Sequence, residues 1–170
     1  PPSIAGPRLR AAFDRGLPGL GVRTFTQKTV NKAVVTEHGF RFTAGVHGAE
    51  VTIEAKSAVL ASGRFFGKGL KAERGHVREA VFDLPVTQPE NRTDWHRESF
   101  FDPQGHAINQ AGLETDAIFR PLGADGQCFH PRLHSAGAIL AHQDWMRQKC
   151  GAGLAIATAY KSVKELIKGL

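Results

Sequence analysis

Two short apolar runs that each lead into a glycine place the strongest constraint on how this chain folds. The first, "SAVLASG", ends at Gly63, and the second, "LHSAGAIL", runs through Gly137. Continuous apolar runs of this length are typical of strands that are buried on both faces. After the second run comes "CGAGLAIATA", whose small residues predict the start of a helix near Gly151. The chain therefore combines buried strands, glycine turns and a helix whose backbone can be closely approached.

Residues 31–55 predict a sheet of a different kind. The stretches "NKAVVTE", "FRFTA" and "EVTIEA" have strand character, with "EHG" and "GVHGA" as the turns between them. Phe40 and Phe42 alternate with polar residues, as do Val51 and Ile53, which indicates one solvated face. Together these stretches predict an antiparallel β-meander.

Helices are predicted near both ends of the chain. The opening "PPSIAGPRLRAAFDRGL" predicts a short helix with Pro7 in its first turn and Gly16 at its end, and "GVRTF" predicts a short strand after it. The last 20 residues predict an amphipathic helix that packs through an apolar stripe. The stripe contains Ile156, Tyr160, Val163, Ile167 and Leu170.

The intervening segment, residues 64–130, has no long hydrophobic period. It is rich in glycine, proline, charge and aromatic residues, so we expect irregular structure with short elements. Segments of this kind often carry functional sites. Within it, "TDWHRESFFDP" gathers acidic and aromatic side chains that suit either a catalytic pair or the packing of an exposed loop.

Composition narrows the possible classes of protein. A length of 170 residues with 41% hydrophobic and 22% charged residues is typical of one soluble domain. The apolar runs are shorter than the roughly 20 residues of a membrane span, and "PPSIAGPRLR" has no signal-peptide core. The net charge of +6 suits a phosphorylated small molecule or an acidic protein, but the basic residues are not interleaved with aromatics as on nucleic-acid surfaces. Two cysteines, Cys128 and Cys150, favour a reducing compartment.

The predicted C-terminal helix and the glycine turns carry the candidate chemistry. The helix N-terminus offers free N–H groups and the positive end of the helix dipole. Gly151 and Gly153 either admit a planar or phosphorylated ligand there or simply allow close packing, and the pattern leaves both open. Cationic and imidazole groups flank the turns and suit phosphate binding or proton transfer, or else remain solvated. These groups are Arg64, Lys68, His142 and Lys149.

Metal and dinucleotide motifs are not recognised. Cys128, His130 and His134 lie close together in "CFHPRLH", but their spacing matches no closed zinc site, and we predict no metal. Cys150 is either a thiol activated by the helix N-terminus or a small residue in a tight turn. "GLPGLG" has the wrong spacing for a dinucleotide loop, and no G-x-G-x-x-G follows a strand.

Three stretches occur in an order that resembles the second half of the B subunit of anaerobic glycerol-3-phosphate dehydrogenase: "PPSIAGPRLR", "AVLASGRFFGKGL" and "CGAGLAIATA". "AERGHVREAVFDLPV" and "AGAILAHQDW" extend the resemblance over nearly the whole chain, which is also similar to the fumarate reductase/succinate dehydrogenase class of flavoproteins. The resemblance implies the C-terminal part of an α/β flavoprotein fold, α+β in itself, without the N-terminal βαβ unit. It divides the chain into a flavin-domain part (1–75), a cap or substrate-side segment (76–130) and a flavin-domain strand and helix (131–170).

The resemblance also implies a flavin cofactor, FAD by the fold or FMN. Its contacts would come from the strand ends and the last helix, whose N-terminus would face the pyrimidine edge of the ring and stabilise the reduced form. Of the groups that flank the two glycine turns, Arg64, Lys68 and His142 are the catalytic candidates. In place of the family's acidic residue after the last strand glycine, this chain has Ala138. The implied cofactor contacts are Ser62, Gly63, Gly137, Ala138, Cys150, Gly151, Ala152 and Gly153.

The activity implied by the resemblance is oxidation of glycerol 3-phosphate to dihydroxyacetone phosphate, with electrons passed to the quinone pool. The implied partners are a catalytic A subunit and a membrane-anchoring iron–sulfur subunit, which would hold the chain at the cytoplasmic face of the membrane without a span of its own. We expect the chain alone to be inactive and to lack part of its flavin site. The alternatives are an interaction module that only docks onto partner subunits, and a flavoprotein that acts on a carboxylate or a steroid.

Overall fold

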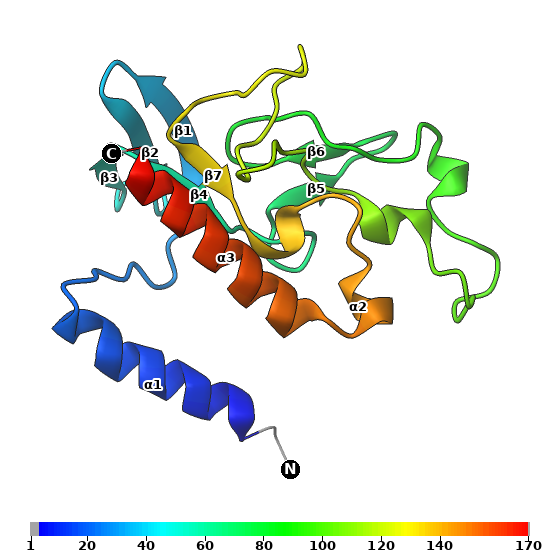
Figure 1. Ribbon diagram of the computed structural model, residues 1–170, viewed down its shortest axis with the longest axis horizontal. Coiled ribbons are helices and arrows are strands. Elements are labelled where there is room, and N and C mark those ends of the chain that lie inside the picture. The colour runs from blue at the N-terminus through cyan, green and yellow to red at the C-terminus, as the bar shows by residue number, and fades with distance from the viewer. Residues whose placement is uncertain (1–3, 170) are drawn as a thin grey trace.

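The computed structural model describes residues 4–169 and shows a mixed helix-and-strand architecture, in agreement with the predicted α/β class (Figure 1). Three small sheets make up the strands: β1–β2–β3, β4–β7 and β5–β6. In chain order, the elements are α1 (Ala5–Gly19), β1 (Val30–Thr36), β2 (Gly39–Ala44), β3 (Val51–Ala55), β4 (Ala58–Leu60), β5 (Leu70–Ala72), β6 (Val77–Glu79), the 3₁₀ turns η1 (Arg92–Asp94) and η2 (Ala107–Gln110), β7 (Leu133–Ser135), the 3₁₀ turn η3 (Gly137–Ile139), α2 (Trp145–Gln148) and α3 (Gly151–Lys168).

The first sheet is the antiparallel meander that the sequence predicts. Phe40 lies opposite Ala55 and Phe42 opposite Ile53 across β2 and β3. Phe40 is buried, whereas the residues between these positions on β3 are exposed, so one face of the sheet is solvated. The turn into β2 requires Gly39, because its φ is +147° and an added Cβ would collide with the Ala55 carbonyl oxygen.

The two glycine-ended runs form a parallel pair of strands. β4 and β7 are distant in the chain, yet they pair with Leu60 opposite Ser135, and both residues are buried. Each strand leads into a glycine in the left-handed region, Gly63 with φ 68° and Gly137 with φ 75°. The predicted strands and glycine turns are therefore confirmed, with β7 fully buried and β4 only partly so.

Helix α3 packs on β7 and η3 through small hydroxyl side chains. Thr158 Oγ1 accepts the Gly137 N–H at 2.8 Å, and Ser162 Oγ donates to the Ser135 carbonyl oxygen at 2.8 Å. Small side chains occupy this face because they let the helix backbone approach the strand. The predicted packing of the apolar stripe is wrong, since its described members lie on the opposite side of the helix; Leu170 lies outside the described residues. Their exposed fractions are 72% for Ile156, 70% for Tyr160, 44% for Val163 and 62% for Ile167.

Helix α1 is longer than predicted and lies apart from the sheets (Figure 1). It continues through Gly16 to Gly19, because a glycine lowers helix propensity by about 1 kcal/mol without removing a hydrogen bond. None of its residues is buried. The strand predicted over 21–25 is instead exposed coil, with no neighbouring strand for it to pair with among the described residues. None of the helices within residues 4–169 has the length and apolar character to span a bilayer.

Residues 64–130 contain short elements joined by irregular loops, as predicted. β5 and β6 form an antiparallel hairpin, and isolated bridges connect the loops that follow. The core draws side chains from before, within and after this segment: Phe40, Leu60, Leu70, Val77, Leu84, Trp95, Ile108, Leu113, Leu133 and Ile139. The predicted division into segments 1–75, 76–130 and 131–170 stays a prediction.

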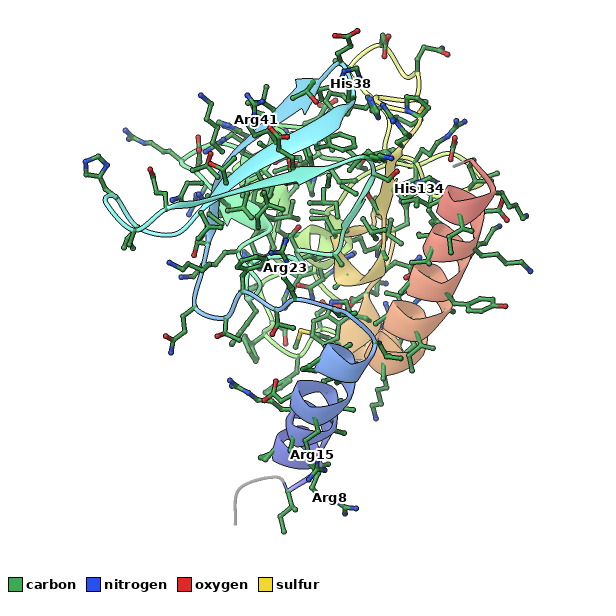
Figure 2. The ribbon with its side chains drawn as sticks, turned by 90° about the vertical axis from the view of Figure 1, so that its left-hand side faces the viewer. Arg8, Arg15, Arg23, His38, Arg41 and His134 are labelled. Atoms are coloured by element: carbon green, nitrogen blue, oxygen red, sulfur yellow. The ribbon has the colours of Figure 1, made fainter. Side chains whose placement is uncertain are left out.

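A buried histidine lies on β7 close to α3 (Figure 2). The His134 side chain is 2% exposed, and neither of its ring nitrogens has a hydrogen-bond partner. Burial lowers the pKa of His134, Arg120 lowers it further, and the negative charges of Asp116 and Glu165 oppose the change. The folded domain therefore disfavours a proton at this position.

We expect the domain to lose stability as the pH falls below about 6.5, the ordinary pKa of histidine. In that range the unfolded chain binds a proton that folded His134 does not, so the free energy of unfolding decreases with decreasing pH. Above this range both states are neutral, and His134 contributes no pH dependence. Melting temperatures from about pH 5 to 7.5 test this, with His134→Leu expected to flatten the profile and exposed His47→Leu expected to leave it unchanged. An unchanged profile in His134→Leu would show that the burial of this ring is not responsible.

Candidate functional site

The turn that follows β4 is built from closely packed glycines. A Cβ added to Gly67 would collide with the Ser62 carbonyl oxygen, and one added to Gly69 would collide with the Gly63 carbonyl oxygen. Ser62 Oγ is buried here without a hydrogen-bond partner. The turn thus packs its glycines against its own backbone and encloses one unpaired hydroxyl at the carboxyl end of a parallel strand, where open α/β sheets bind ligands.

The turn after β7 lies beside the turn after β4, because parallel neighbours end at the same edge of a sheet. Gly137 begins this second turn in the left-handed region, and Ala138 follows it within η3. Four of the predicted flavin contacts, Ser62 and Gly63 with Gly137 and Ala138, therefore come from two adjacent strand ends.

The other predicted flavin contacts lie in the first turn of α3. A Cβ on Gly151 would lie 3.2 Å from the Trp145 ring, so close packing against α2 explains this glycine. Gly153 is exposed, and a Cβ there would have no atom within 4 Å. Ala152, between them, is also exposed, and Cys150 is a free, partly buried thiol. Of the two glycines whose role the pattern left open, only Gly153 offers free backbone to a ligand.

Arg64 links the two strand-end turns. Its Nη2 donates to the Leu140 carbonyl oxygen at 2.9 Å, and the residue is 7% exposed. Burial lowers the pKa of Arg64, and the negative charge of Asp144 opposes the change. Arg64 Nε is buried without a hydrogen-bond partner. An unpaired guanidinium N–H of this kind can bind a carbonyl or phosphate oxygen.

Lys68 and His142, the other catalytic candidates, lie on the surface near these turns. Both have left-handed backbones, with φ of 62° and 64°. His142 Nε2 lies 2.6 Å from a carboxylate oxygen of Glu114 in an exposed ion pair. Across residues 4–169, no hydrogen bond or ion pair joins Lys68 or His142 to Arg64. A catalytic role for these three residues stays a prediction.

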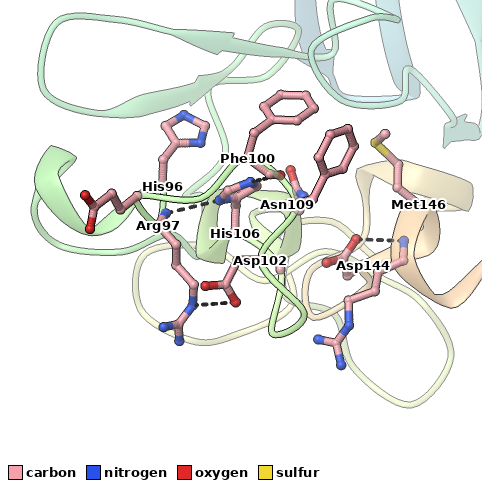
Figure 3. Close-up of a pocket in the computed structure, with 12 residues that line it drawn as sticks. His96, Arg97, Phe100, Asp102, His106, Asn109, Asp144 and Met146 are labelled. Carbon is pink, nitrogen blue, oxygen red and sulfur yellow. Dashed lines mark hydrogen bonds and ion pairs between the residues drawn. The ribbon is translucent and has the colours of Figure 1, made fainter.

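A cavity of about 620 Å³ lies between the loop 96–109 and α2 (Figure 3). Arg147 Nη1 holds the loop to α2 by donating to the Gln104 carbonyl oxygen at 2.8 Å. At Gly105 the loop comes so close that an added Cβ would lie 2.7 Å from Asp144 Oδ2. The volume is in the range of small-molecule sites. Apolar and charged side chains share the lining: Phe100, Phe101, Met146, Arg97, Asp102 and Asp144.

Two histidines line this cavity and differ in their hydrogen bonds (Figure 3). His106 Nδ1 accepts the Arg97 N–H at 3.1 Å, and Nε2 lies 3.0 Å from the Phe100 carbonyl oxygen, so the proton is on Nε2 and neither nitrogen is free. The His96 ring lies edge-on to His106 at 5.3 Å, and its nitrogens have no hydrogen-bond partner within the described part of the chain. His96 is therefore the cavity imidazole that can exchange a proton with a bound molecule.

The sequence pattern indicated this region only through "TDWHRESFFDP". Two of its acidic side chains have different partners within the loop: Asp102 pairs with Arg97 at 3.7 Å, and Asp94 accepts a hydrogen bond from Asn91 Nδ2 at 3.3 Å. The structure therefore favours loop packing for these residues over a catalytic pair. The remaining lining residues come from η2, α2 and the residues just before them, and they share no spacing, so no pattern indicated them. The missed residues are His106, Asn109, Asp144, Met146 and Arg147.

The cysteine and histidines of "CFHPRLH" do not form one site. The His130 ring packs on Phe40 at 4.7 Å, and its Nδ1 accepts the Arg132 N–H at 3.1 Å. Cys128 is a free thiol. In the described part of the chain, no group of three His, Cys, Asp or Glu residues could hold a metal ion.

Three features of the strand-end turns and of the first turn of α3 fit a flavin: the unpaired Ser62 hydroxyl, the left-handed glycines Gly63 and Gly137, and the open backbone at Gly153. Residues 1–154, most of the sequence, match the model of the FAD binding domain family. The chain belongs to the FAD binding domain family. No solved structure matches it.

Several curated relatives of this FAD binding domain chain carry the name of the B subunit of anaerobic glycerol-3-phosphate dehydrogenase. The relative from Halobacterium salinarum, whose name includes the word "probable", is 34% identical over 94% of this chain and 37% of the relative. Those from Yersinia pseudotuberculosis and Vibrio cholerae are 32% and 33% identical, each over 98% of this chain and 38% of the relative. The resemblance drawn from the sequence is thereby confirmed, and the chain spans less than two fifths of the length of these relatives.

Proposed function

We propose that this chain forms part of the flavin site of an anaerobic glycerol-3-phosphate dehydrogenase. The enzyme would oxidise glycerol 3-phosphate to dihydroxyacetone phosphate and pass the electrons towards the quinone pool. The observation that carries the proposal is the convergence of Ser62, Gly63 and Gly137 at one edge of a parallel strand pair. The names of the relatives and the family match support it. FAD is the proposed cofactor, with FMN as the alternative.

The chain's own residues would bind the flavin through backbone groups of the glycine turns and through the helix dipole of α3. Ser62 Oγ would supply a hydrogen bond, and Gly63, Gly137 and Gly153 would let the ring approach the backbone. The N–H groups in the first turn of α3 would favour negative charge on the reduced ring. When bound, FAD would supply the acceptor for the hydride of an alcohol oxidation, which carries both electrons.

The cavity beside α2 is the proposed substrate site. Asp144 lines the cavity, and its negative charge opposes the lowering of the Arg64 pKa by burial. The cavity therefore lies near Arg64 and the strand-end turns. Arg147 forms no ion pair within residues 4–169, so the N–H groups of its guanidinium other than the one bonded to Gln104 could bind a phosphate group. His96 would accept the hydroxyl proton, and Arg64 would bind a substrate oxygen. Lys68 and His142 remain catalytic candidates on the surface near the strand-end turns.

The relatives' designation as B subunits supports a role within a complex. The proposed partners are a catalytic A subunit and a membrane-anchoring iron–sulfur subunit, with the chain at the cytoplasmic face of the membrane. A second candidate function is a non-catalytic docking module. The exposed apolar faces of α1 and α3 favour it.

Replacing Gly153 with Val should abolish flavin retention without unfolding the domain. Gly153 has open space around it, so a branched side chain there disturbs no neighbour and only blocks a ligand from the backbone. The measurement is flavin absorbance after desalting, on the chain mixed with FAD or FMN, alone and together with the part of the Yersinia pseudotuberculosis relative outside the match. Ala157→Val, at an exposed position on the same helix, is the matched control.

Equal flavin retention by both variants would contradict contact at Gly153, and no flavin in any assembly would contradict the proposed function. Where flavin is retained, the rate at which the assembly reduces an electron-accepting dye shows which substrate it oxidises. Glycerol 3-phosphate should support it, and a dicarboxylate or a steroid should not.

A further inference from the structure

Asp144 is a buried carboxylate that has one unpaired oxygen beside the cavity. The residue is 5% exposed and lines the cavity between α2 and the loop 96–109 (Figure 3). Its Oδ1 caps α2 by accepting the Arg147 N–H at 3.2 Å. Among the described residues, no donor forms a hydrogen bond with its Oδ2. Because a buried acceptor without a partner is costly, this oxygen is available to a donor on a bound molecule.

Gly105 brings the loop close to this oxygen without placing a side chain on it. An added Cβ would lie 2.7 Å from Asp144 Oδ2 and 3.4 Å from Arg147 Cδ. The Gly105 N–H donates to the Asp102 carbonyl oxygen at 2.9 Å and not to Asp144. The φ of +73° at Gly105 also favours glycine. The loop therefore forms a wall of the cavity and leaves the carboxylate uncovered.

The charged side chains that line the cavity suit a molecule with a single anionic group. Arg97 pairs with Asp102 at 3.7 Å, so its charge is already matched. Arg147 forms no ion pair in the part of the chain that the structure describes, and most of its N–H groups remain for a phosphate. Glu98 is exposed, so water screens its charge. A second anionic group would face Asp144 with no free arginine of the lining to neutralise it.

The neighbouring cation Arg64 does not pair with Asp144. The negative charge of Asp144 opposes the lowering of the Arg64 pKa by burial, so the two groups are near each other. Within residues 4–169, however, no ion pair or hydrogen bond joins them, and Arg64 Nη2 donates instead to the Leu140 carbonyl oxygen. Asp144 Oδ2 therefore stays available although a cation is close.

A hydroxyl group is the ligand group that matches an unpaired carboxylate oxygen in this setting. It can donate a hydrogen bond to Oδ2, whereas a carboxylate or a keto oxygen only accepts and would meet Asp144 as acceptor against acceptor. A site that binds a hydroxyl through a buried polar group discriminates strongly against analogues without it, because the buried group is then left unpaired. Asp144 can therefore decide which molecules bind.

We propose that Asp144 selects the substrate of this cavity: its Oδ2 accepts a hydrogen bond from a hydroxyl group of the substrate, while Arg147 binds the single phosphate group. The cavity therefore takes small phosphate monoesters that carry free hydroxyl groups, and the charge of Asp144 excludes dicarboxylates. This role rests on the proposed function, which uses the cavity beside α2 as the substrate site. It adds the residue that distinguishes glycerol 3-phosphate from a dicarboxylate.

Isothermal titration calorimetry on the chain alone tests this role, because residues of this chain, from His96 to Arg147, line the cavity. Glycerol 3-phosphate is compared with n-propyl phosphate, which has the same phosphate group on a carbon chain of the same length but no hydroxyl group. The wild type should bind glycerol 3-phosphate at least about tenfold more tightly, since the propyl ester cannot donate to the carboxylate. Succinate should not bind measurably.

Asp144→Asn should remove this preference and keep the cap of α2. Asparagine is as good an N-cap as aspartate, but its amide has no charge and can present an N–H to the cavity. The variant should bind the two phosphate esters with similar affinity and gain measurable affinity for succinate. Asp94→Asn removes the same charge at an exposed position outside the cavity, and it should keep the wild-type preference.

Equal affinity of the wild type for the two esters, or binding of neither, would overturn the proposal; this comparison needs no variant, so it decides the matter even if Asp144→Asn does not fold. An Asp144→Asn protein that loses affinity for both esters by the same factor would also overturn it, because Asp144 would then be only structural. Tighter binding of O-phosphoethanolamine than of glycerol 3-phosphate would do so as well, since the partner of Asp144 would be an ammonium group.

These titrations use no flavin, which separates the two proposals. Selective binding of glycerol 3-phosphate by a chain that retains no flavin in any assembly would contradict the proposed function and leave the role of Asp144 intact. An assembly that retains flavin and oxidises glycerol 3-phosphate with the same KM in Asp144→Asn as in the wild type would contradict the role of Asp144 alone.

Discussion

Replacing Glu79 with Gln should lower the free energy of unfolding by about 1–3 kcal/mol. The Glu79 carboxylate is fully buried and accepts three backbone N–H groups, from Val81 at 2.8 Å, Phe82 at 2.7 Å and Leu84 at 3.5 Å. Glutamine has the same shape, but its amide NH₂ would face at least one of these three backbone N–H groups, donor to donor. At least one buried N–H would then lose its acceptor, at a cost of about 1–3 kcal/mol for each unpaired group.

Chemical denaturation of the variant measures this effect, and Glu73→Gln is its control. Glu73 follows β5 in the same hairpin, but it is 43% exposed and pairs with Arg78 on the surface. Such pairs contribute about 0–1 kcal/mol, so this variant should be close to wild type. A loss in Glu79→Gln as small as that expected for Glu73→Gln would show that the hairpin tolerates the amide and that Glu79 does not organise the turn leading to the core residue Leu84.

The parts of the fold that could be predicted are those specified by local pattern. Alternation around Phe40 indicated the meander, because one face of that sheet packs and the other meets water. The runs ending at Gly63 and Gly137 indicated buried strands, and both glycines have the left-handed backbone that such turns need. These features depend on neighbours in the chain, so the sequence contains the information directly.

The features that could not be predicted depend on contacts between distant segments. The apolar stripe of α3 indicated a buried face, but the inner face consists of Thr158 and Ser162, whose hydroxyls bond to β7 and the turn after it. Hydropathy identifies apolar residues and not the surface that covers them. The cavity was missed for a similar reason. The hydrogen bond of Arg147 to Gln104 joins α2 to a loop far from it in the chain, and no sequence pattern relates the two segments.

Replacing Gly69 with Ala should destabilise the domain by about 3 kcal/mol and disorganise the turn after β4. Gly69 is buried, and a Cβ there would collide with the Gly63 carbonyl oxygen and lie 2.5 Å from Ser62 Oγ. The residue cannot move away freely, because its N–H donates to the Arg64 carbonyl oxygen at 3.1 Å and its carbonyl oxygen accepts the Ala80 N–H at 2.9 Å. The collision must therefore displace the backbone of the turn.

Gly75→Ala is the matched control, because a Cβ at this exposed position of the β5–β6 turn has no atom within 4 Å. Its free energy of unfolding should change by no more than about 0.5 kcal/mol. Thermal melts of the two variants, followed by flavin retention at a temperature where both remain folded, separate stability from binding. Since Ser62 and Gly63 are proposed to contact the flavin, folded Gly69→Ala should retain less of it than Gly75→Ala. A Gly69→Ala protein that melts like the control would mean that the turn has room for a side chain, and its close glycine packing would then not explain the pattern "SGRFFGKG".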